Sequence, residues 1–277
     1  MAFSAEWLAL REPADRAARS STLVEHLAGH LPRSRPLEVL DLACGTGANL
    51  RALADLLPGP QQRWLLVDHD RTLLEAARGL MEPWLNTRDP RERASRAIEM
   101  RALDLRDLSR TEIFSARTLV TASALLDLVS EDWLTGLVDH CRTHRAAVLF
   151  ALTYDGRMTC APEEPGDDLV RELVNRHQRR DKGLGPALGP TAPEVATRLL
   201  QSAGYSVRRE SSDWGLGPES GPLQEALVAG WSDAATEEAP DESDAVRRWR
   251  STRLAHIAGG QSRIIVGHQD LAGWLEL

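Results

Sequence analysis

Short apolar runs alternate with amphipathic segments over the first half of this chain. Runs rich in Val, Leu and Ile are typical of buried strands, whereas apolar residues spaced three or four positions apart are typical of helices. The pattern predicts strands at 37–43, 64–68, 98–103, 117–124 and 146–153, with helices at 47–57, 70–81 and 131–143. Strands that alternate with helices pair in parallel through right-handed crossovers, which leaves helices on both faces of the sheet.

The two ends of the chain depart from this alternation. Residues 5–31 show an interrupted helical period, and Pro13 is expected to start a second helix after a short break. Residues 82–96 are predicted to form an extended loop or a short extra helix. The remaining pattern predicts helices at about 167–180, 193–203, 222–236 and 243–257 and an antiparallel pair of strands at 205–210 and 263–268.

We interpret the chain as one domain that covers all 277 residues. A hydrophobic content of 42% is ordinary for a globular α/β domain of this length. The expected parts are a helical N-terminal lid segment (1–35), a ligand-binding core (36–155), a substrate lid (156–192) and a segment that completes the sheet (193–277), with a helical insertion at about 217–260.

The first strand runs into an acid and then into a glycine turn, in the sequence Val39-Leu-Asp-Leu-Ala-Cys-Gly-Thr-Gly47. Such a turn lets a ligand approach the backbone, with N–H groups of the following helix directed at it. Dinucleotide enzymes place a third glycine where this chain has Leu50, and their ligand carries phosphates. Because Asp41 would repel phosphates, the junction favours a ligand with an ammonium and a sulfonium, namely S-adenosylmethionine (SAM).

Acids also end the next two strands. Asp68 is placed to accept hydrogen bonds from ribose hydroxyls. Asp104 is placed to accept one from an adenine amino group while Leu105 covers the ring, although Asp107 could compete with Asp104 for this role.

On these residues the chain resembles the class I SAM-dependent methyltransferases. Their first motif is matched by residues 39–47, and their ribose and adenine acids by Asp68 and Asp104. The resemblance implies a Rossmann-like, mostly parallel sheet of seven strands with an antiparallel last strand, and helical N-terminal and C-terminal insertions that form a lid. The chain departs from the family pattern in its C-terminal half. Residues 211–262 separate its last two strands, which the family usually joins by a short hairpin. The implied cofactor is SAM, and the cofactor-binding residues are Asp41, Ala43, Gly45, Gly47, Asp68, His69, Asp104, Leu105 and Ser123.

Candidates for the methyl acceptor site come from two regions. In the family the exit of the fourth strand lies beside the transferred methyl group, which indicates Ser123 and Asp127, and Tyr154 follows the fifth strand. The second region is the cationic helix near residues 175–183. It contains His177, whose ordinary pKa suits proton removal, and Arg180, whose planar guanidinium suits binding of a carboxylate or a phosphate. The catalytic candidates are thus His177, Asp127, Ser123 and Tyr154, and the substrate-binding candidates are Arg11, Asp127, His177 and Arg180.

Two motifs of related methyltransferases are missing from the sequence, which narrows the possible acceptors and argues against a metal. The fourth strand does not end in the Asn/Asp-Pro-Pro-Tyr/Phe run of base N-methyltransferases. The fifth strand is followed by Tyr154-Asp-Gly156 and not by the Asp-Asn pair of metal-dependent O-methyltransferases, so no metal is expected.

Charge and composition limit the partners. A formal net charge of −8 argues against broad nucleic-acid binding, so we expect a small-molecule acceptor, and the arginines leave room for an anionic one. The chain shows no apolar run of membrane-spanning length and no secretory signal. Its three cysteines are too few and too scattered for a disulfide framework, so a cytoplasmic location is expected. The pattern leaves the oligomeric state open.

Three other functions stay open. The first is a protein of the same fold that holds SAM for regulation or assembly without catalysis. The second is an RNA methyltransferase, which would require Arg88, Arg91, Arg93, Arg96 and the 171–182 helix to form one face. The third is a nucleotide-dependent oxidoreductase, which Asp41 and Leu50 disfavour.

Overall fold

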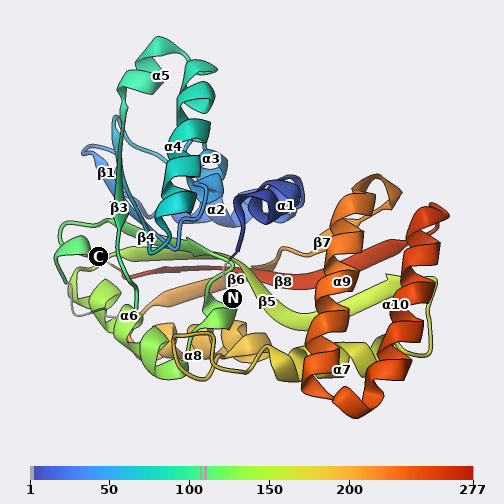
Figure 1. Cartoon of the computed structure of the whole chain (residues 1–277). Helices are drawn as coiled ribbons and strands as arrows, with labels where there is room; N and C mark the ends of the chain where they lie inside the picture. Colours follow the sequence, from blue (N-terminus) through green and yellow to red (C-terminus); the bar gives the residue numbers. More distant parts are fainter. Residues whose placement is uncertain (1–2, 107, 109–110, 277) are drawn as a thin grey trace.

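An eight-stranded mixed sheet organises the molecule (Figure 1). The computed structural model describes residues 3–106, 108 and 111–276. Seven strands follow the order β3-β2-β1-β4-β5-β8-β6, and β7 pairs with β8. The strands are β1 (Leu37–Leu42), β2 (Gln62–Asp68), β3 (Arg96–Ala102), β4 (Leu119–Ser123), β5 (Ala147–Ala161), β6 (Ser206–Ser211), β7 (Trp214–Leu216) and β8 (Arg263–Trp274).

The first five strands pair in parallel, and β8 runs antiparallel to β5, β6 and β7. This confirms the predicted fold class, including the antiparallel last strand. Because all five parallel strands end at one edge, that edge gathers the residues that follow them.

Helices cover both faces of the parallel part. Apolar side chains of α2 (Ser21–Ala28), α3 (Ala48–Leu53) and α4 (Arg71–Asn86) form one buried cluster against the sheet. Those of α6 (Glu131–Thr143) and α8 (Ala192–Ser202) belong to a second cluster on the other face. Of the helices in the described part of the chain, none is long and apolar enough to cross a membrane.

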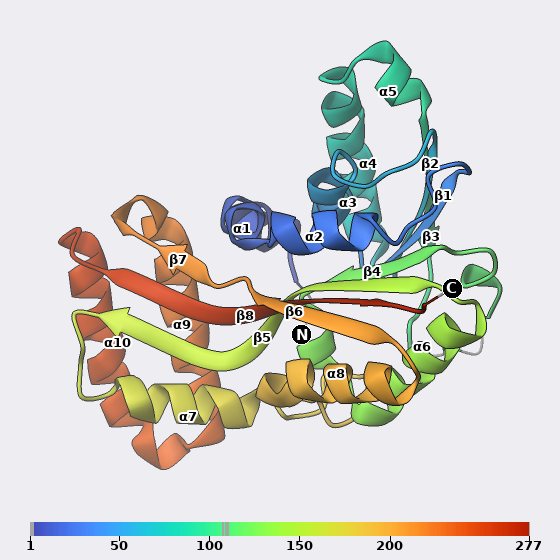
Figure 2. The ribbon, with the colours of Figure 1, turned by 180° about the vertical axis from the view of Figure 1, so that it is seen from behind.

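Strands β5 and β8 extend beyond the parallel sheet and carry a helical lobe (Figures 1 and 2). Helices α7 (Asp167–His177), α9 (Gly221–Glu238) and α10 (Ser243–Ala258) share a third buried cluster with this extension. The strand predicted at 146–153 is therefore too short, because β5 continues to Ala161 after an irregularity between Tyr154 and Met158.

The predicted pairing of 263–268 with 205–210 is wrong in register. Residues 269–274 pair with β6, whereas 264–266 pair with the outer part of β5 and with β7, which the sequence analysis missed. Both halves of β8 are apolar enough to be buried, so the pattern of residues did not distinguish them.

Smaller differences concern the helices. The N-terminal break falls at Arg19 and not at Pro13, which lies inside α1 (Ala5–Ala18), because Ser20 caps the start of α2 by accepting the N–H of Leu23 at 3.0 Å. Helix α4 continues through Pro83 to Asn86, and α5 (Pro90–Ala94) is the short extra helix allowed for residues 82–96.

Candidate functional site

The glycine turn after β1 forms the centre of the candidate site. Ala43, Gly45 and Gly47 all have positive φ angles, of 50°, 54° and 78°. The φ angle of Gly47 favours glycine there, because an L side chain rarely adopts this conformation. A Cβ atom at this position would also lie 2.9 Å from the Cε atom of Met81, whose side chain would have to shift.

The N–H groups of both glycines in this turn are used within the protein. Gly45 donates to Asp68 Oδ2 at 2.9 Å, and Gly47 donates to the carbonyl of Cys44 at 2.8 Å. The N–H groups of the two glycines are therefore engaged within the protein, and the expected role of the N–H groups at the start of the following helix stays a prediction. Asp68 also accepts the N–H of Asp70 at 2.9 Å through Oδ1, which fixes its buried carboxylate at the end of β2.

Asp41 is fully buried at the end of β1. Its Oδ1 atom accepts a hydrogen bond from Asn49 Nδ2 at 2.7 Å, whereas its Oδ2 atom has no partner among the described residues. Burial raises the pKa of Asp41 to about 7, although Asn49 and the nearby Arg19 oppose this rise. A buried carboxylate oxygen without a partner is costly in an empty site, and a cationic ligand would relieve that cost.

Arg19 is the residue that sequence reasoning missed. It lies at the junction of α1 and α2, where its guanidinium donates to Asn49 Oδ1 at 2.9 Å and to Ser123 Oγ at 2.8 Å. Burial lowers its pKa, with Asp270, Asp15 and Asp41 opposing. The only signal in the sequence was an arginine immediately before the capping residue Ser20, which does not reveal that the junction lies on the glycine turn.

The residues predicted to bind adenine lie at the same edge of the sheet, but Asp104 already has a partner within the protein. Asp104 is exposed and bound by the side chain and backbone of Arg106, which together lower its pKa to about 2. Leu105 is buried, and His69 is exposed, with its Nδ1 atom 3.3 Å from Asp68 Oδ1. Asp107 lies outside the described residues.

Helix α1 lies across the glycine turn. A Cβ atom at Gly45 would be 3.0 Å from Leu8 Cδ1. Arg51, on α3, donates to Glu12 of α1 at 2.6 and 3.1 Å and to the carbonyl of Thr46 at 2.7 Å. The N-terminal helix is therefore tied to the turn by a forked ion pair.

Among the acceptor-site candidates, Asp127 and Tyr154 are brought together. Asp127 is buried in the turn Leu126–Leu128 after β4, and the backbone N–H of Tyr154 stabilises its charged form. Arg11 lies on the buried side of α1, where three hydrogen bonds of 2.9–3.2 Å join it to Asp15. Ser123 lies on the cofactor side of this group, bound to Arg19.

His177 and Arg180 are not part of this group. Both contact Glu237 near the end of α9, and Arg180 also contacts Glu238 at 2.8 Å. Their positions are explained by packing of the segment around α7 on α9, and a substrate role for them stays a prediction.

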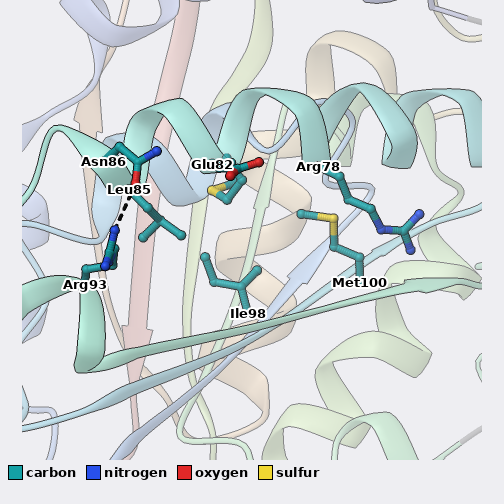
Figure 3. A pocket seen from close by; sticks show the side chains of 8 residues that line it. Arg78, Glu82, Leu85, Asn86, Arg93, Ile98 and Met100 are labelled. Carbon is teal, nitrogen blue, oxygen red and sulfur yellow. Dashed lines mark hydrogen bonds between the residues drawn. The ribbon is translucent and has the colours of Figure 1, made fainter.

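One groove lies away from the strand ends that carry Asp41 and Asp68. It has a volume of about 430 Å³ and lies between α4 and the edge strand β3 (Figure 3). Its residues are Arg78, Met81, Glu82, Leu85, Asn86, Arg93, Ile98 and Met100.

The surface required for RNA methylation is not formed. Helix α5, which carries Arg91 and Arg93, lies at the top of Figures 1 and 2, whereas α7 lies at the bottom. Arg88 and Arg96 both pair with Asp55, at 2.7 and 2.5 Å. These arginines and the helix at 171–182 therefore do not share one face.

Comparison with known proteins supports the fold. No protein-family model matches the chain, and no curated protein sequence matches it. The chain is similar to a solved cyclopropane-fatty-acyl-phospholipid synthase-like protein from Lactobacillus casei, with a TM-score of 0.58 and 13% identity over 95% of this chain and 92% of that one. It is also similar to the YcgJ protein from Bacillus subtilis, with a TM-score of 0.50 and 12% identity over 93% of this chain and all of that one. At these identities the likeness concerns the fold alone.

Proposed function

We propose that this chain, which has the class I SAM-dependent methyltransferase fold, transfers a methyl group from SAM to a small-molecule acceptor. The observation that carries the proposal is the charge arrangement at the glycine turn. Two buried carboxylates, Asp41 and Asp68, end neighbouring strands, and the guanidinium of Arg19 lies beside the first of them. This arrangement suits a nucleoside that carries an amino-acid group.

The methionine end of SAM fits the residues around β1. The partnerless Oδ2 atom of Asp41 would accept the ammonium, directly or through water. Arg19 would bind the carboxylate, because planar arginine forks bind carboxylates well. Ser123 and Asn49 already hold Arg19 in place, so little ordering is needed on binding.

The adenosine end fits the residues after β2 and β3. Asp68 is held in place by two backbone N–H groups and retains lone pairs for ribose hydroxyls. Asp104 would have to exchange part of its contact with Arg106 for the adenine amino group, while Leu105 would cover the ring.

When bound, SAM supplies an electrophilic methyl group on a sulfonium. The protein then has to orient an acceptor in line with the methyl–sulfur bond and exclude water, which can contribute several kcal/mol. Helix α1, which lies on the glycine turn, is placed to exclude water from this region. Turnover of labelled SAM with an acceptor separates this function from SAM binding without catalysis.

Calorimetry with three related ligands tests the cofactor site. SAM and its product S-adenosylhomocysteine (SAH) carry the amino-acid group, whereas methylthioadenosine lacks it. We expect Asp68→Asn to weaken binding of all three by about tenfold or more, because each contains the ribose. We expect Arg19→Gln to weaken SAM and SAH by roughly 10–150-fold, as loss of about 1.5–3 kcal/mol implies, and to leave methylthioadenosine unchanged.

Asp139→Asn, an exposed change on α6, is the matched control and should bind like the wild type. Thermal unfolding of each variant verifies that it is folded. The proposal is wrong if the folded wild type binds none of the three ligands, or if it binds NAD more tightly than SAM.

A further inference from the structure

Two polar side chains, on the turn after β4 and on β8, are buried without using all their hydrogen-bonding atoms. Asp127 and His268 are 7% and 6% exposed. The Oδ1 atom of Asp127 and the Nδ1 atom of His268 are both buried and have no partner within the described part of the chain. Buried polar atoms are normally paired, so two such atoms in one region indicate a place for a polar ligand.

These side chains lie beside the proposed cofactor site. Asp127 follows β4 only four residues after Ser123, which is bound to the cofactor-side Arg19. His268 is directly opposite Tyr154 in the pairing of β5 with β8, and the Tyr154 backbone stabilises the Asp127 carboxylate.

Aromatic rings form part of this region. The ring centroid of His268 is 6.2 Å from that of Tyr154 and 5.0 Å from that of Trp214. Rings next to a carboxylate are typical surroundings for a cationic group, because the face of a ring is negative.

The local charges disfavour an anionic acceptor. Arg11 acts on both Asp127 and His268, but three hydrogen bonds join its guanidinium to Asp15. Its guanidinium carbon lies 4.8 Å from the ring centroid of Trp214. Burial lowers the pKa of His268 to about 4, so this side chain is neutral near pH 7. Arg11 pairs with Asp15, and Asp155, the other acid that acts on His268, pairs with Arg157. Among these groups, the carboxylate of Asp127 is the charge without an ion-pair partner.

We infer that this site takes an amine, with Asp127 contacting the acceptor nitrogen and receiving its proton. The inference rests on the proposed function and specifies its substrate class. It also replaces the expectation of an anionic acceptor, which rested on the arginines. Of the two arginine candidates, Arg180 pairs with Glu237 and Glu238, and Arg11 pairs with Asp15.

Methyl transfer to an amine at this site needs no reactant besides SAM. An amine arrives as its ammonium, and one N–H proton passes to the Asp127 carboxylate, which exposes the nitrogen lone pair. The lone pair forms the new bond to the methyl carbon as the bond from that carbon to sulfur breaks, with its electron pair going to sulfur. The products are a methylated ammonium and neutral SAH, and Asp127 returns its proton to water.

Three probes that differ in one group test the inference. Benzylamine, benzyl alcohol and benzoate share a ring and differ in offering an ammonium, a hydroxyl or a carboxylate. We expect calorimetry with the SAH-saturated protein to show benzylamine binding at least about tenfold more tightly than the other two, as one ion contact implies. Asp127→Asn should remove this preference and leave the affinity for SAH within about twofold of wild type.

Asp132→Asn, an exposed change at the start of α6, is the control for Asp127→Asn and should retain the preference. If Asp127→Asn does not fold, Asp127→Ser serves as the second variant. The inference is overturned if SAH binds but benzylamine does not bind preferentially, or if both folded Asp127 variants keep the preference. Failure of SAH itself to bind would instead contradict the proposed function.

Discussion

At the scale of single residues, the candidate site depends on buried acids that lack partners. Asp41 and Asp127 each have one such oxygen among the atoms that the structure describes, and burial raises their pKa values to about 7 and about 6. Uncompensated buried carboxylates destabilise a fold, so their presence at one edge of the sheet is best explained by a ligand.

The pKa of Asp41 predicts how cofactor binding depends on pH. The folded-state pKa, about 7, is above the ordinary value of 3.8, so the carboxylate becomes charged only as the pH rises through 7. Because the charged form attracts the ammonium of SAM, we expect the dissociation constant to fall about eightfold between pH 6 and pH 7.5. Calorimetry at these pH values measures it.

Asp41→Asn should bind SAM more weakly and with little pH dependence over this range. Methylthioadenosine, which has no ammonium, should show little dependence even with the wild-type protein. A dissociation constant for SAM that rises between pH 6 and pH 7.5 would contradict the assigned role of Asp41.

At the scale of elements, α1 is unusual because its buried residues are charged. Arg11 and Asp15 are the buried residues of this helix, all of whose positions the structure describes. Its partly buried apolar residues pack against the core of the outer lobe, whereas its contact with the glycine turn includes the ion pair of Glu12 with Arg51. The ion pair is therefore a polar contact that joins α1 to the turn.

Removing this ion pair should loosen α1. We expect Glu12→Gln to speed amide hydrogen exchange in α1 by about fivefold, because a partly exposed pair contributes about 1 kcal/mol. Exchange measured by mass spectrometry reports this, and Glu6→Gln, at an exposed position of the same helix, is the matched control. Equal exchange rates in the two variants would show that Glu12 does not hold the helix.

At the scale of the whole molecule, the outer lobe and the parallel sheet share β5 and β8. The lobe is held together by Arg253, a fully buried residue of α10 that donates to Asp167 at 3.0 Å and to the carbonyl of Pro162 at 2.5 Å. Trp249 donates to the same Asp167 carboxylate at 2.7 Å. The continuous strands predict that the lobe and the sheet unfold together.

Arg253→Ala should therefore lower the stability of the entire domain. Removing one member of a buried pair typically costs about 3–5 kcal/mol, because the remaining carboxylate loses its partner. We expect one unfolding transition in denaturant, shifted by that free energy, with the affinity of the folded protein for SAH unchanged. Two separate transitions would mean that the lobe is an independent unit.

The sequence by itself determined the parallel sheet and the position of the glycine turn. The apolar runs and their spacing predicted the five parallel strands, and the acids Asp41 and Asp68 at the ends of β1 and β2 marked the edge of the sheet that carries the candidate site. These features are local, because strand periodicity, glycine turns and the residue that follows a strand are all legible within a few positions.

Only the tertiary structure decided what lies opposite that edge. Arg19, His268 and Trp214 reach the site from distant parts of the chain, and the register of β8 decides which residues face Tyr154. The cationic helix near His177, prominent in the sequence, instead packs against α9. Contacts between distant segments depend on which buried faces pair, and hydrophobic pattern alone does not specify that choice.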